Sequence, residues 1–145
     1  MKSFKSETDF TKWFCECIEK VGGFCFALVG GVRQRSGLPD RYVSHTRWQG
    51  FIEFKKDGNK VKKGGLQDIT LRKLRKTGTP ACIVTYDKRK ERIVFETNHE
   101  CGSWVIYVSS VDIDGKTDVQ CAKLFLDRLV ALTGDAIVFD NQTKY

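Results

Sequence analysis

The chain has 145 residues, the size of one compact domain, and carries a formal net charge of +7. Hydrophobic residues make up 41% and charged residues 30%, a balance that fills a core and excludes a disordered chain. No run approaches the ~20 apolar residues of a membrane span, and the first residues, Met1 to Glu7, contain no apolar segment of a signal peptide. We therefore expect an intracellular protein of the cytoplasm or nucleoid.

The positive charge is concentrated in the middle of the chain. Residues 41–92 hold 15 Lys and Arg against 5 Asp and Glu, whereas residues 93–145 hold 4 against 8. A basic segment in an otherwise mixed domain indicates a polyanionic partner. A solvated charged surface explains the same pattern and stays open as the alternative.

The cysteines do not form a metal-binding motif. Cys15 and Cys17 are the only close pair, their spacing differs from that of a zinc site, and the chain has only two histidines. Most of the six cysteines lie in apolar runs, so we expect free thiols in the core.

The first elements follow from hydrophobic periodicity and capping signals. Ser6 opens a helix that ends at Gly22-Gly23, residues 24–29 form a buried strand, and residues 30–39 form a glycine-rich loop. The inward stripe of the helix has the spacing of a core-facing surface: Phe10, Phe14, Cys17, Ile18 and Val21.

The remaining elements alternate between strands and helices. Residues 40–46 and 49–55 predict a hairpin, residues 66–76 a helix, and residues 81–86, 92–96 and 103–108 three further strands. Asp114-Gly115 predicts a hairpin turn, residues 119–132 an amphipathic helix closed by Gly134, and residues 136–139 a last short strand. The pattern is typical of an α/β fold with a mixed sheet.

The hairpin carries the candidate chemistry. Because side chains alternate across a strand, Glu53 and Lys55 share one face with Phe51, and Asp40 opens the neighbouring strand. If the two strands pair, Asp40 and Glu53 converge. Paired carboxylates form a hard oxygen site suited to Mg²⁺ or Mn²⁺, and a lysine beside them orients an attacking water. An ordinary strand with an exposed Glu-Lys pair is the alternative.

These residues resemble a known signature. Pro39-Asp40, followed after twelve residues by Glu53-Phe54-Lys55, resembles the PD-(D/E)xK pattern of metal-dependent nucleases. Gly37-Leu38 before it, Gln67 on the next helix and a strand after Gly78 are similar to the VRR-Nuc branch, which includes phage and bacterial nucleases and is related to Holliday-junction resolvases. The similarity covers about residues 7–86.

The resemblance implies a restriction-endonuclease-like mixed β-sheet flanked by helices. It implies a single nuclease domain over residues 1–145, with a motif-bearing core at about 7–96 and a C-terminal strand-helix extension at 97–145. No family motif falls in that extension, which completes the sheet or builds a dimer interface.

The resemblance also implies the roles of the site residues. Asp40 and Glu53 would bind Mg²⁺, with Mn²⁺ as a substitute, Lys55 would be the catalytic lysine, Gln67 would support the site, and Glu7 would complete metal binding. Glu7 lies on the inward stripe of its helix, although a first-turn acid also complements the helix dipole. Gln67 shares a face with Leu71 and Leu74, where a core amide bonded to backbone is the alternative.

Basic side chains around this site are candidates for phosphate contacts. They lie in the glycine-rich loop, the lysine-rich loop after Lys55 and the following helix, which we expect to turn them outward: Arg33, Arg35, Lys56, Lys60, Lys62, Lys63, Arg72, Lys73, Arg75 and Lys76. Trp48, between the hairpin strands, is a further candidate for stacking on a base.

The implied function is a Mg²⁺-dependent DNA endonuclease, structure-specific for branched DNA. Relatives that cut branched DNA act as symmetric dimers, so a homodimer is implied, and a phage-encoded protein would act in the host cytoplasm. A catalytically silent DNA-binding module on the same fold and an RNA-directed nuclease are the alternatives, since nothing in the sequence reads a 2′-hydroxyl.

Overall fold

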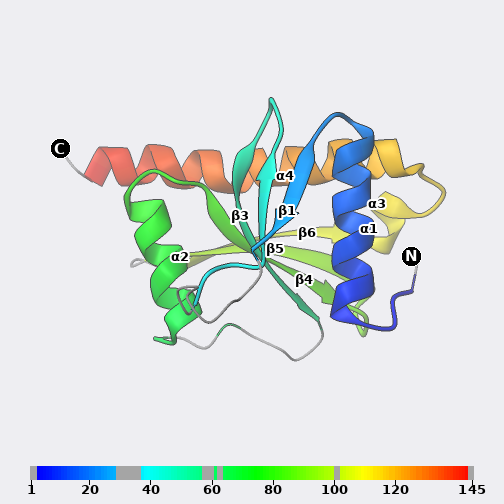
Figure 1. Cartoon of the computed structure of the whole chain (residues 1–145), viewed down its shortest axis with the longest axis horizontal. Coiled ribbons are helices and arrows are strands. Elements are labelled where there is room, and N and C mark those ends of the chain that lie inside the picture. Colours follow the sequence, from blue (N-terminus) through cyan, green and yellow to red (C-terminus); the bar gives the residue numbers. More distant parts are fainter. Residues whose placement is uncertain (1–2, 29–36, 57–60, 62–63, 100–101, 144–145) are drawn as a thin grey trace.

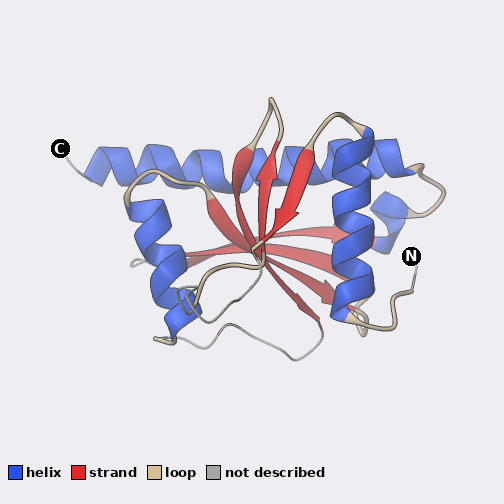
Figure 2. Ribbon diagram, in the orientation of Figure 1, coloured by secondary structure: helices blue, strands red, loops and turns tan. Residues whose placement is uncertain are grey.

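Six strands form one mixed sheet in the computed structural model of the chain, with helices on both of its faces (Figures 1 and 2). The structure describes residues 3–28, 37–56, 61, 64–99 and 102–143. In chain order the elements are α1 (Glu7–Lys20), β1 (Phe24–Ala27), β2 (Arg41–Ser44), β3 (Gln49–Lys56), α2 (Leu66–Lys76), β4 (Ala81–Asp87), β5 (Arg92–His99), β6 (Gly102–Ser109), α3 (Ser110–Ile113) and α4 (Asp118–Thr143).

The strands lie in the sheet in the order in which they follow one another in the chain. All neighbours are antiparallel except β3 and β4, which are parallel and are joined through α2. The α/β class, the mixed sheet between helices and the C-terminal strand-helix extension are therefore confirmed. Within the described segments, no helix is both long and apolar enough to cross a membrane.

The main core lies between the sheet and two helices, α1 and α4. Phe10 and Phe14 of α1 are fully buried against Phe54 of β3 and Phe125 of α4. Ser6 caps α1 as predicted, since its hydroxyl accepts a hydrogen bond from the backbone N–H of Asp9 at 3.1 Å. The helix ends before Gly22, whose φ of 89° is the left-handed conformation that glycine adopts without strain.

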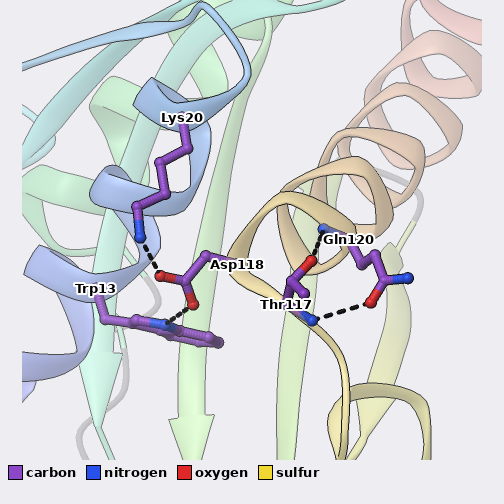
Figure 3. Close-up of polar contacts among 5 residues, drawn as sticks. All are labelled: Trp13, Lys20, Thr117, Asp118 and Gln120. Atoms are coloured by element: carbon purple, nitrogen blue, oxygen red, sulfur yellow. Dashed lines mark hydrogen bonds and ion pairs between the residues drawn. The ribbon is translucent and has the colours of Figure 1, made fainter.

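Polar contacts hold α4 against α1 at the start of α4 (Figure 3). Asp118 accepts a hydrogen bond from the indole N–H of Trp13 at 3.1 Å and pairs with Lys20 at 2.6 Å. Thr117 and Gln120 bond reciprocally across the first turn of the helix, the arrangement of a capping box. The start of α4 is thus satisfied and tied to the helix that packs beside it.

The opposite face of the sheet is covered by one helix, α2. Leu71 and Leu74 pack on Phe51 of β3 and on Ala81 and Ile83 of β4. In Figure 1, α2 and α1 stand at opposite sides of the view, while α4 runs across the width of the molecule. Because Phe51 packs against α2 and side chains alternate along a strand, Glu53 and Lys55 also face the α2 side of the sheet.

The structure differs from the predictions at three elements. Residues 24–27 form the edge strand of the sheet. The strand is not buried as predicted, since Phe24 and Phe26 point away from the main core and are 61% and 39% exposed. Residues 136–139, expected as a strand, continue α4, which runs past Gly134. Asp114-Gly115 joins α3 to α4, so the turn is present but it does not close a hairpin.

Most of the described tryptophan and cysteine side chains are buried in the core. Trp48 is buried, and its indole N–H donates to the hydroxyl of Thr133 on α4 at 2.7 Å, so it is not available to stack on a base. Among the described residues the cysteines are free thiols, as expected, and Cys25 is only partly buried.

Candidate active site

Asp40 and Glu53 meet where β2 begins beside β3. Arg41 pairs with Ile52 in the antiparallel register, so one further step places Asp40 opposite Glu53. The backbone N–H of Asp40 donates to Oε1 of Glu53 at 3.1 Å, and the backbone N–H of Phe54 donates to Oδ2 of Asp40 at 3.0 Å. Each carboxylate is thus oriented by the opposite strand.

The loop before Asp40 is fixed by a glycine. Gly37 has a φ of 86°, and a Cβ there would lie 2.8–2.9 Å from Leu66, including its backbone carbonyl. Only glycine allows this loop to approach the start of α2 so closely. On the other side of Asp40, its carbonyl accepts the backbone N–H of Leu28 at 2.9 Å. The sequence Gly37-Leu38-Pro39-Asp40 is therefore held between the start of α2 and Leu28, the residue that follows β1.

Lys55 lies beside the carboxylate pair. Its Nζ is 3.2 Å from Oε2 of Glu53, and the Lys55 side chain is 19% exposed while that of Glu53 is 1% exposed. Glu53, Lys55 and Phe51 share one face of β3, whereas Ile52 and Phe54 are buried in the main core, as the alternation predicts.

The carboxyl group of Glu53 has an altered acidity. Burial and the negative charge of Asp40 raise the pKa of Glu53 to about 7, although the charge of Lys55 lowers it. Two carboxylates so close in a buried place repel one another when both are ionised. A divalent cation between them would remove that repulsion, and two hard carboxylates are donors that suit Mg²⁺ or Mn²⁺.

Glu7 lies next to this pair. Burial raises the pKa of Glu7, the charge of Lys55 lowers it, that of Asp40 raises it again, and a hydrogen bond from the backbone of Lys56 lowers it. The Nζ of Lys56 also donates to the carbonyl of Lys5 at 2.9 Å, which ties the end of β3 to the start of α1. In the part of the chain that the structure describes, no group of three or more His, Cys, Asp or Glu has the geometry to hold a metal ion. The role of Glu7 as a third ligand stays a prediction.

Gln67 is the residue of α2 to which the resemblance gives a role in the site. It is half-buried in the first turn of α2, on the side where Leu71 and Leu74 pack, as expected. Within the described segments its side chain makes no hydrogen bond to Asp40, Glu53 or Lys55, so its supporting role also stays a prediction.

Asp68, the next residue, has a structural role that was not predicted from the sequence. It is 2% exposed, accepts the backbone N–H of Gly64 at 2.8 Å and pairs with Arg72 at 3.1 Å. Asp68 occupies the third position of α2, where an acidic side chain can accept a backbone N–H that has no partner within the helix. This position in the sequence was the signal from which its capping role could have been predicted.

The basic residues of α2 divide into exposed and buried ones. Lys73 and Lys76 are exposed, and Arg72 is one-third exposed and paired with Asp68. The outward placement predicted for Arg75 is wrong, because Arg75 follows Leu71 by one helical turn and is 5% exposed. Five further residues that were predicted to contact phosphates lie outside the described residues: Arg33, Arg35, Lys60, Lys62 and Lys63.

Comparisons with known proteins find a likeness among solved structures. The sequence matches no protein-family model and no curated protein. Among solved structures, the chain is similar to Hjc of Archaeoglobus fulgidus, a Holliday junction resolvase from an archaeal hyperthermophile, with 15% identity and a TM-score of 0.46 over 81% of this chain and 98% of that one.

Proposed function

We propose that the protein is a metal-dependent nuclease that hydrolyses phosphodiester bonds of DNA at Asp40, Glu53 and Lys55. The observation that carries the proposal is the pair of backbone hydrogen bonds, 3.1 Å and 3.0 Å, that turns two carboxylates from neighbouring strands toward one another beside a lysine. A structural ion pair needs one acid and one base, whereas a second acid here raises the pKa of Glu53 and so opposes the ionised state.

The roles divide among the side chains. Asp40 and Glu53 would hold Mg²⁺, with Mn²⁺ as a substitute, and Glu7 would complete the ligand set. The ion would supply charge neutralisation at the phosphate and a more acidic bound water. The ammonium of Lys55, held by Glu53 and partly open to solvent, would orient the attacking water or donate to the phosphate oxygens.

The charge distribution supports a polyanionic substrate. Lys73 and Lys76 are exposed on α2, the helix that covers the same face of the sheet as Glu53. Contacts of such side chains to phosphates give affinity without reading sequence, so branched or otherwise distorted DNA is proposed to be selected by its shape. A homodimer and an intracellular location belong to the same proposal.

Cleavage of labelled four-way, flap, linear and single-stranded DNA, each with Mg²⁺, Mn²⁺ or EDTA, tests the proposal. We expect cleavage with either metal ion and none in EDTA. Asp40→Asn, Glu53→Gln and Lys55→Ala should abolish cleavage while the variants stay folded, and Asp127→Asn, an exposed acid on α4, is the matched control. Full activity of Asp40→Asn, or inertness of the purified protein with both ions on all four substrates, would refute it. Cleavage assays on RNA substrates of the same four structures distinguish a DNA nuclease from the RNA-directed alternative.

A further inference from the structure

We infer that four aromatic side chains beside the proposed site form a stacking surface for unpaired bases of the nucleic-acid substrate. They are Phe24 and Phe26 of β1, Tyr42 of β2 and Phe51 of β3, here called the aromatic row. The inference rests on the proposed function and names the substrate class: a nucleic acid with unpaired nucleotides next to the cleaved phosphodiester.

The register of the sheet places the four rings in one line. Phe26 pairs with Tyr42, and Tyr42 pairs with Phe51, so their side chains project from the same face of three adjacent strands. Ring centroids are 5.0 Å apart for Phe24 and Phe26, 5.3 Å for Phe26 and Tyr42, and 5.0 Å for Tyr42 and Phe51. The opposite faces of these strands, through Cys25 and Val43, pack on the main core.

The row is continuous with the proposed site. Phe51 precedes Glu53 by two residues on one face of β3, and Tyr42 follows Asp40 by two residues, which in a strand is the same face. The row therefore leads from the carboxylate pair across β2 to β1, the edge strand of the sheet. Over two strand spacings the row extends about 10 Å.

The outer end of the row is open to solvent. Phe24 is 61% exposed and Phe26 39% exposed, whereas Cys25 between them projects from the opposite face and packs on the main core. Exposed apolar side chains gathered in a row mark an interaction surface. The segment that contains the inner half of the row, residues 41–92, holds 15 basic residues against 5 acidic ones, which favours a polyanion over an apolar protein partner.

Bases in a duplex already stack on each other, whereas unpaired bases offer their faces to aromatic side chains. A polyanion drawn to this face would thus gain stacking only where its strands separate. The expected substrate is single-stranded or has an unpaired stretch, and the phosphate to be cleaved lies beside that stretch.

Binding in EDTA, where no cleavage occurs, tests this directly. A short fluorescein-labelled single strand and the matching duplex are titrated with wild type, Phe24→Ala/Phe26→Ala, Phe24→Leu/Phe26→Leu, and Trp104→Ala. Trp104 is the matched control, an aromatic 37% exposed on β6 at the opposite edge of the sheet. Phe24 and Phe26 are both exposed, so the two double variants should fold, and thermal unfolding checks this.

We expect both double variants to weaken single-strand binding by about tenfold or more, with duplex binding unchanged and Trp104→Ala like wild type. A 2-aminopurine in the single strand should be quenched by the wild type and much less by the double variants. Wild-type affinity of the alanine or the leucine pair would overturn the inference. So would an effect confined to the oligomeric state in sedimentation, since the row would then bind a second copy of the chain.

The two proposals fail in different ways. Metal-dependent cleavage together with unchanged binding by the double variants would overturn the stacking surface and leave the nuclease. Loss of single-strand binding in the double variants of a protein inert with every ion would support the surface and refute the nuclease.

Discussion

Replacing Glu53 by glutamine, in protein freed of divalent ions, is expected to raise the free energy of unfolding above pH 7. Burial and the charge of Asp40 raise the pKa of Glu53 from its ordinary value of 4.5 to about 7. Between these two values the folded state binds more protons than the unfolded state, so the contribution of Glu53 to stability falls as pH rises. Glutamine has the shape of the protonated carboxyl and removes this dependence.

The magnitude follows from the size of the pKa shift. At about 1.4 kcal/mol per pKa unit, the rise corresponds to about 3 kcal/mol lost by the wild type above pH 7. The variant should thus be more stable than wild type by up to about 3 kcal/mol at about pH 8 and nearly equal to it near pH 4.5 or below.

Urea denaturation in EDTA across this pH range measures the difference, with Glu16→Gln, an exposed acid on α1, as the control. A Glu53→Gln protein less stable than wild type at about pH 8 would contradict the reasoning, because the ionised carboxylate would then stabilise the fold. Mg²⁺ should raise the stability of the wild type and leave the variant unchanged if Glu53 is a ligand.

Three further changes test the supports of the site and the core. Gly37→Ala should lower stability by about 1–3 kcal/mol, because its positive φ and its contact with Leu66 both exclude a Cβ, and thermal unfolding measures the loss. Thr133→Val should cost about 1–3 kcal/mol in urea denaturation, because the buried indole N–H of Trp48 loses its acceptor. Asp118→Ala, which removes the contacts of α4 to α1, should cost about 1–2 kcal/mol; equal stability at any of the three would refute its assigned role.

Local signals in the sequence were enough to predict most elements. The serine cap and apolar stripe of α1 and the boundaries of α2 depend on residues within one or two turns, and the structure matches them. The hairpin of β2 and β3 was also predicted, and with it the meeting of Asp40 and Glu53, because antiparallel pairing across a short turn leaves little choice of register.

Longer-range features could not be read in this way. An apolar strand such as β1 reads alike at the centre and at the edge of a sheet, and only the strand order distinguishes them. Arg75 was expected outside because it is charged, yet its position one turn after Leu71 places it inside. The strand expected at residues 136–139 rested on four apolar residues, too few to distinguish a strand from a continuing helix.

The two faces of the sheet are covered unequally, and the two proposals place the nucleic acid on the less covered face. The main-core face is closed by α1 and α4, which are fixed to each other through Asp118 and to the sheet through Trp48 and Thr133. Among the described helices, α2 alone packs on the other face; it is eleven residues long and lies mainly on β3 and β4. The part of that face over β1 and β2 therefore keeps Phe24 and Phe26 exposed. This surface adjoins the carboxylate pair, so a nucleic acid bound as proposed, with one phosphate at Glu53, would have the surface beside it.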